Sequence, residues 1–172
     1  MALTQQFARV APDYLDRCRA SALDSAGGVP NWDPPAEDLL DAGWGVWGLI
    51  RHCRASGAAP GTAALLERAV SGDPDGDVAF LDHDEVYDGF ADPPRLLGPT
   101  AVADIAHGLD AIDAAALLAD LPDSPAEAAA MCGFGPEFAG DIRAHLAAPL
   151  AAVRQFYREA ALRGWCVVVW VD

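Results

Sequence analysis

The residues best suited to chemistry are gathered in one acidic segment, residues 71–94. It holds Asp73, Asp75, Asp77, Asp82, Asp84, Glu85, Asp88 and Asp92, with His83 among them and no basic residue. Carboxylates at alternate positions, as at 73, 75 and 77, can converge on a hard cation such as Ca²⁺. A calcium loop then needs glycine at its sharp turn and glutamate at its twelfth position, where this chain has Val78 and Asp84. The pattern therefore favours a solvated acidic loop over a calcium site.

His83 offers a second kind of chemistry, because an imidazole among carboxylates can act as a general base or as a transition-metal ligand. A single histidine with flexible carboxylates makes a poor zinc site, however. The other histidines, His52, His107 and His145, fall on separate predicted helices. A small metal-dependent hydrolase that uses His83 and its neighbouring carboxylates is kept as the alternative function. We predict no cofactor, no metal site and no catalytic residue.

Other catalytic and phosphate-binding motifs find no support in the sequence. There is no Gly-x-Ser-x-Gly nucleophile elbow and no Walker A loop, and no Gly-x-Gly-x-x-Gly follows a predicted strand. Cys53 and His52 are adjacent on a predicted helix, so their side chains diverge and do not form a catalytic pair. The absence of an assembled catalytic set favours a binding protein over an enzyme.

The charge balance limits the kinds of partner. The chain of 172 residues has 26 acidic residues against 11 basic ones, all arginine, for a net charge of −15. This balance repels phosphate backbones, so nucleic-acid binding is not expected, whereas a basic protein partner is compatible with it. No apolar run is long enough to span a membrane, and no signal peptide is recognisable. We predict a cytoplasmic protein that does not bind membranes and is a monomer or a homodimer.

The four cysteines are scattered along the chain without a Cys-x-x-Cys pair. Their apolar surroundings predict buried, reduced thiols.

The elements that must hold the acidic segment in place are organised around the C-terminus. The pattern predicts an amphipathic helix from about Phe138 to Arg163, a stop at Gly164, and an apolar strand, 165–171. A strand that is apolar on both faces belongs inside a sheet that is covered on both sides. Further helices are expected over 12–23, 36–56, 62–70, 98–109, 113–121 and 125–131, with extended segments at 3–10 and 95–97 and an ambiguous apolar island at 78–81. The predicted fold is a single compact α+β domain, 1–172, with a small mixed sheet that contains the C-terminal strand and is covered by several helices.

Tryptophans and glycines mark the predicted helix 36–56. Its apolar stripe includes Trp44 and Trp47, which we assign to the core together with Trp165 and Trp170. Its three glycines, at 43, 45 and 48, each cost about 1 kcal/mol against alanine in a helix interior, which indicates close packing against a neighbour. Trp32, in a proline-flanked loop, is predicted to be partly exposed and able to contact a partner.

Three blocks of the sequence, taken in their order and spacing, resemble the YfbM-like bacterial proteins. They are FYREAALRG (156–164) followed by VVVW (167–170), LDAGW (40–44), and RLLGP (95–99) leading into a helix. The resemblance covers most of the chain from about Asp38 onward and implies a compact α+β domain without an established activity. Gly45 and Gly48 stand where members of the family often have histidine, so a polar site built on those positions would be impaired here.

Together these features predict an uncharacterised bacterial protein that acts as a non-enzymatic binding module with an acidic surface. A more specific form is an immunity-like protein that neutralises a basic partner by charge complementarity. The predicted binding residues are Trp32, Asp82, His83, Asp84, Glu85 and Asp88.

Overall fold

The computed structural model describes residues 3–57 and 60–172. Its sheet has four strands in the order β2-β1-β4-β3, namely β1 (Gln5–Val10), β2 (Leu39–Asp41), β3 (Arg95–Leu97) and β4 (Cys166–Val171). The α+β class and the interior position of the C-terminal strand are thus confirmed. The strand pairing is antiparallel throughout, whereas a mixed sheet was expected. The apolar pattern of β4 indicated burial on both faces, which is independent of strand direction once helices or loops cover both sides.

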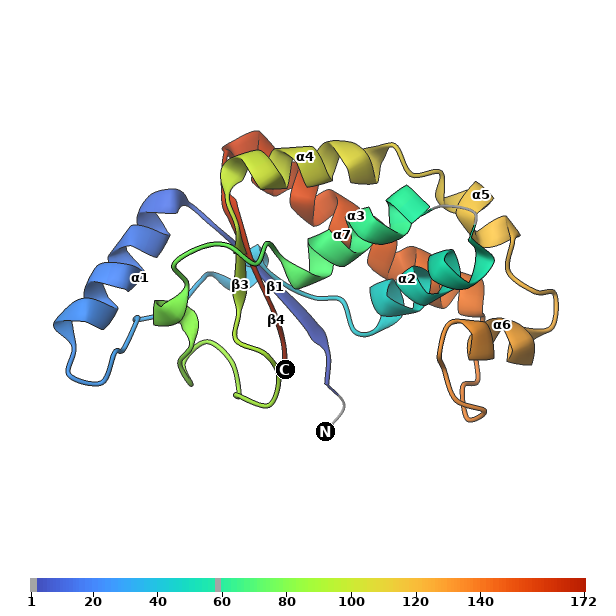
Figure 1. The fold of residues 1–172 in the computed structure, drawn as a ribbon, viewed down its shortest axis with the longest axis horizontal. Helices are drawn as coiled ribbons and strands as arrows, with labels where there is room; N and C mark the ends of the chain where they lie inside the picture. The colour runs from blue at the N-terminus through green and yellow to red at the C-terminus, as the bar shows by residue number, and fades with distance from the viewer. Residues whose placement is uncertain (1–2, 58–59) are drawn as a thin grey trace.

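The two faces of the sheet carry different layers (Figure 1). One face is covered by α2 (Gly45–Ser56), α3 (Pro60–Ser71), α4 (Pro99–Asp110) and α7 (Ile142–Arg163), from which the short helices α5 (Ala114–Ala119) and α6 (Pro125–Met131) extend. The other face is covered by α1 (Pro12–Asp24), the 3₁₀ turn η2 (Ala79–Leu81) and the acidic segment. Val167 and Val169 point into the first layer, and Val168 and Trp170 into the second. Among the described residues, no helix combines the length and apolar character needed to cross a bilayer.

The predicted helix 36–56 is wrong in its first half. Residues Ala36–Asp38 form a 3₁₀ turn, η1, Leu39–Asp41 form β2, and the helix α2 begins only at Gly45. The backbone of Gly43 has a φ of +53°, which breaks any helix at this point. Tertiary contacts explain the difference, because Asp38 forms a buried ion pair with Arg9 and β2 pairs with β1.

The close packing that the glycines of α2 predicted is confirmed. A Cβ atom at Gly45 would lie 2.5 Å from Cγ of Pro149 and 2.9 Å from the carbonyl oxygen of His145, both on α7. A Cβ atom at Gly48 would lie 2.8 Å from Cδ2 of Leu146. These two positions therefore let the backbone of α2 approach α7, which remains one continuous helix through Pro149.

We expect Gly45→Ala to lower the free energy of unfolding by about 2 kcal/mol, because a proline ring and a backbone carbonyl cannot move aside for the added methyl group. The matched control is Gly61→Ala in α3, where a Cβ atom would meet no atom within 4 Å. That change should be neutral or stabilise by up to about 1 kcal/mol through helix propensity. Urea denaturation of the two variants measures both effects, and equal stabilities would contradict this account of the α2–α7 contact.

The four cysteines are free and buried, as predicted. Burial raises the pKa of Cys132 to about 11 and also raises the pKa of the thiols of Cys18, Cys53 and Cys166. Since the thiolate is the reactive form, native protein at pH 8 should react with Ellman's reagent at least about 100-fold more slowly than denatured protein. Denatured protein should titrate all four thiols. A fast-reacting thiol in the native state would contradict the buried positions.

Candidate functional site

The acidic residues predicted to bind a partner lie in one folded turn after η2. Val86 and Tyr87 are buried in the core cluster on this face of the sheet and anchor the turn. His83 is half-buried, and the carboxylates of this turn are exposed, namely Asp82, Asp84, Glu85 and Asp88. The structure thus presents these carboxylates on a surface whose backbone is tied to β4.

The fold brings Trp32 to this turn, as the joint prediction of these residues requires. The backbone N–H of Trp32 donates to Oε2 of Glu85 over 3.3 Å, although the two residues are 53 positions apart. The Trp32 ring packs edge-on against Tyr14 and Trp170, at centroid distances of 5.7 and 6.4 Å. The side chain is half-buried, so the predicted partial exposure of Trp32 is confirmed.

Several of these polar groups also stabilise the turn itself. The hydroxyl of Tyr87 donates to Oδ1 of Asp82 over 2.6 Å, and this bond raises the pKa of Tyr87 to about 12. The backbone N–H of Asp88 donates to Oδ1 of Asp172, whose other oxygen accepts from Nε1 of Trp170. Nδ1 of His83 accepts from the backbone N–H of Glu85 over 3.1 Å. The acidic turn is therefore an ordered surface.

The carboxylates with calcium-loop spacing do not converge. Asp73 forms a two-pronged ion pair with Arg68, over 2.7 and 2.8 Å, and Asp77 lies 3.9 Å from Arg19 instead. Throughout residues 3–57 and 60–172, no three side chains of histidine, cysteine, aspartate or glutamate are grouped so as to hold a metal ion.

The four histidines remain on separate elements, α2, the acidic segment, α4 and α7. Nε2 of His52 lies 2.9 Å from the carbonyl oxygen of Leu117, and His145 packs edge-on against Phe134 and Phe138.

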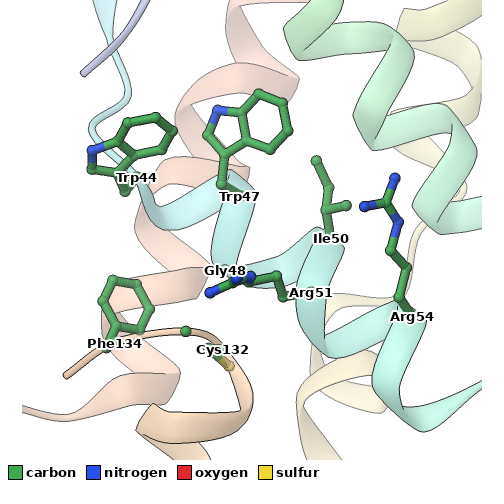
Figure 2. A pocket seen from close by; sticks show the side chains of 9 residues that line it. Trp44, Trp47, Gly48, Ile50, Arg51, Arg54, Cys132 and Phe134 are labelled. Atoms are coloured by element: carbon green, nitrogen blue, oxygen red, sulfur yellow. The ribbon is translucent and has the colours of Figure 1, made fainter. Parts of the chain in front are cut away.

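A second candidate site, which sequence reasoning missed, lies in the helical layer that contains α2 and α6. We call it the tryptophan–arginine hollow, a cavity of about 420 Å³ (Figure 2). It is lined by Trp44, Trp47, Gly48, Ile50, Arg51, Arg54, Cys132, Gly133 and Phe134. The residues from α2 form one wall, and the turn after α6 forms the other. Pockets of this size and mixed lining are typical of small-molecule sites.

The two arginines of the hollow differ in their partners. Arg54 is bound to Glu67 of α3 over 2.6 Å, which largely neutralises its charge. Arg51 has no hydrogen bond, ion pair or ring contact within the described ranges, where every other arginine has at least one. In Figure 2 its side chain reaches from α2 toward the turn that carries Phe134.

The absence of a side chain at Gly133 makes room for the guanidinium of Arg51. Gly133 has a φ of +81°, and a Cβ atom there would lie 1.8 Å from Nη1 of Arg51. The guanidinium thus occupies the space that any larger residue at position 133 would fill. Phe134, next in the chain, is held by rings of Phe138 and His145 at 5.1 and 5.0 Å.

The two tryptophans of the hollow differ in how firmly they are held: Trp47 is fixed by a hydrogen bond, and Trp44 is more exposed. Nε1 of Trp47 donates to Oε1 of the buried Gln5 over 3.0 Å, and Nε2 of Gln5 donates to the carbonyl of Trp170. Trp44 lies 6.1 Å from Trp47 between ring centroids and is 38% exposed. The assignment of Trp44 to the core is therefore wrong, whereas Trp170 is buried and Trp47 and Trp165 are half-buried against the core. The spacing of Trp44 and Trp47 to Arg51, seven and four positions, places all three on one helix face and was the available signal.

The prediction that no Gly-x-Gly-x-x-Gly motif follows a strand also needs a correction. Gly43, Gly45 and Gly48 have the Gly-x-Gly-x-x-Gly spacing, and in the structure they do follow a strand, β2, and open a helix. That strand is an antiparallel edge strand, however, and not the first strand of a parallel βαβ unit. Since the open faces of Gly45 and Gly48 are filled by α7, this segment serves helix packing.

No protein-family model matches the sequence, and no curated protein matches it. Among solved structures, the chain is similar to a crystal structure described as that of YfbM, a protein of unknown function from Escherichia coli. The TM-score is 0.58 at 14% sequence identity, and the match covers 98% of this chain and 99% of the other. An overlap of this extent at so low an identity establishes the architecture alone, and the fold of this chain is therefore YfbM-like, as the three sequence blocks predicted.

Proposed function

We propose that this protein is a non-enzymatic binding module that recognises a basic protein partner through the acidic segment. The observation that supports this proposal is a set of exposed carboxylates that have no arginine partner among the described residues, although Nδ1 of His83 lies 3.0 Å from Oδ1 of Asp84. Among the described residues, no arginine forms an ion pair with Asp75, Asp82, Asp84, Glu85, Asp88 or Asp92. In the same structure Asp38, Asp73 and Asp110 each have an arginine. The negative charge of these carboxylates is therefore available to a basic partner outside the chain.

The order of the segment supports the same function. Because the turn is anchored by Val86 and Tyr87, binding would not have to order a flexible chain, and that lowers the entropic cost of association. Complementary charge mainly speeds the encounter and selects the partner. Trp32, half-buried beside Glu85, supplies an aromatic surface of the kind that is enriched in protein interfaces. A cytoplasmic, immunity-like protein that neutralises a basic enzyme is the specific form that fits these features.

The test compares two variants with the same change in charge. Asp75, Asp84 and Asp92 are exposed and become asparagine in the first variant. In the control, Asp120, Asp123 and Glu127 near α5 and α6, which are also exposed, become Asn, Asn and Gln. Tagged protein is used to capture partners from cell lysate at low and at high salt, and captured proteins are identified by mass spectrometry.

We expect capture of a basic protein by the wild type and the control, with about tenfold less capture by the first variant, because rim charges act on association. High salt should reduce capture in all cases. If the two variants behave alike, or no basic protein is captured at either salt concentration, the proposal fails. A thermal shift with Zn²⁺ that is lost in His83→Ala would favour the metal-dependent hydrolase instead.

A further inference from the structure

The tryptophan–arginine hollow is lined by residues of the α2 layer, whereas the acidic turn 82–88 packs on the other sheet face through Val86 and Tyr87. A function assigned to that turn therefore leaves the hollow unexplained. We propose that this hollow binds a small molecule with one planar apolar ring and one carboxylate. The ring would lie against Trp44, Trp47 and Phe134, and the carboxylate would be bound by the guanidinium of Arg51.

The charge of the ligand follows from Arg51. Six of the 11 arginines pair with a carboxylate, and four others bind a backbone carbonyl or lie over a tyrosine ring. Arg51 nevertheless has no partner within the described residues, and Gly133 leaves the room in which its guanidinium lies. A guanidinium binds a carboxylate by two parallel hydrogen bonds, and such charge-assisted bonds are the strong ones. The nearby Arg54 does not compete for the ligand, because Glu67 already binds it.

The shape of the ligand follows from the aromatic side chains. Trp47 is fixed by Gln5, and Phe134 is fixed by Phe138 and His145, so two walls are formed before any ligand arrives. Trp44, which is 38% exposed, has no hydrogen-bond partner for Nε1 in the part of the chain that the structure describes. Flat apolar rings pack well against such walls, and a preformed site loses little entropy on binding. A cavity of about 420 Å³ accommodates a single substituted ring system.

A carboxylate is preferred over a phosphate because of the net charge of −15. The summed field of the protein opposes the approach of anions, and it opposes a dianionic phosphate more strongly than a monoanionic carboxylate. One free guanidinium also matches one carboxylate, whereas phosphate sites commonly combine several donors.

The test uses three probes of known chemistry. Indole-3-acetate carries the ring and the carboxylate, indole-3-acetamide is its neutral counterpart, and adenosine 5′-monophosphate carries a ring and a phosphate. Binding is measured by isothermal titration calorimetry, and its place by the five indole N–H signals in a ¹H–¹⁵N NMR spectrum, assigned with Trp→Phe variants. We expect indole-3-acetate to bind saturably and to shift the signals of Trp44 and Trp47, while that of Trp32, which packs on the other sheet face, stays in place.

Two variants test the role of the free guanidinium. Arg51→Gln should weaken the binding of indole-3-acetate about tenfold, since it removes a charge-assisted hydrogen bond. Arg54→Gln, a change of the same kind on the same helix, should alter it less than about threefold, because that arginine is already paired. Both residues are exposed, so the NMR spectra should show folded proteins.

Three results would overturn the inference. Equal affinities for the acid and the amide would remove the carboxylate from the recognition. Tighter binding of adenosine 5′-monophosphate than of indole-3-acetate would show that the site takes phosphates. No shift of Trp44 and Trp47 with any probe would mean that the hollow binds no ligand of this class. None of these results concerns the acidic turn 82–88 on the other sheet face, so the two proposals stand or fall separately.

Discussion

The free energy of unfolding is expected to fall by about 4 kcal/mol when Tyr157 is replaced by alanine. The side chain lies on α7, is fully buried, and packs edge-on against Phe7 of β1 at a centroid distance of 6.3 Å. Its hydroxyl donates to the carbonyl of Ala69 in α3 over 2.6 Å. One side chain thus connects the longest helix, the sheet and a second helix, and its removal leaves a large cavity and a carbonyl without this partner.

The control for this change is Tyr157→Phe, which removes the hydroxyl and keeps the ring. It should cost about 1–2 kcal/mol, the usual effect of leaving a buried acceptor without its donor. Urea denaturation followed by circular dichroism gives both values. If the alanine variant lost no more than the phenylalanine variant, the ring contacts would not be the source of the stability.

The second large effect is expected from Asp38→Ala, at about 3 kcal/mol. Asp38 accepts from Nε of Arg9 over 2.8 Å and from Nη1 of Arg163 over 3.2 Å. Burial alone would lower the pKa of Arg9, but hydrogen bonds and charges from Asp38 and Glu159 more than offset this, so its pKa lies above the ordinary value. Without Asp38, a buried guanidinium would keep its charge and lose its main partner.

Glu67→Ala provides the comparison, because it removes an equal charge from an ion pair whose two side chains are 55% and 45% exposed. Exposed pairs contribute about 0.2–1 kcal/mol, so this variant should stay close to the wild type in urea denaturation. A loss of stability in Asp38→Ala as small as that in Glu67→Ala would show that the Arg9 network does not hold β1, η1 and α7 together.

The two candidate sites depend on these contacts in different ways. The acidic segment is attached to β4 through Val86, Tyr87 and the hydrogen bonds of Asp172. The hollow is built on α2, whose position is set by the contact of Gly45 and Gly48 with α7. A variant that loosens the contact between α2 and α7 is therefore expected to change the hollow before it changes the acidic surface.

Local pattern was sufficient for most of the elements and for the exposed residues. The continuous apolar run of β4 required burial on both faces, and α1, α4, α6 and α7 begin and end within a few residues of the expected positions. Asp75, Asp82, Asp84, Glu85, Asp88 and Asp92 are exposed, as residue type predicts for a solvated loop. Trp32 is half-buried, as its proline-flanked loop predicted.

The sequence pattern gave the wrong secondary structure where contacts with residues far away in the sequence determine it. Leu40 continues the helical spacing of Trp44 and Trp47, yet residues 39–41 form an edge strand. They do so because their backbone pairs with β1 and Arg9 binds the neighbouring Asp38. The direction of the strand pairing was not predicted either. A continuous apolar run such as β4 is common in parallel sheets, but it reports burial on both faces, and this antiparallel sheet is covered on both faces as well.

What the sequence by itself determined is the α+β class, the covered C-terminal strand, the buried thiols and a carboxylate-rich surface, all of which rest on residue type and on spacing within one segment. The tertiary structure alone decided that Arg51, which has no partner among the described residues, lines one cavity with Trp44, Trp47 and Phe134. That arrangement depends on where α2 meets α7 and where Gly133 leaves space, and both are contacts between segments about 80 or more positions apart.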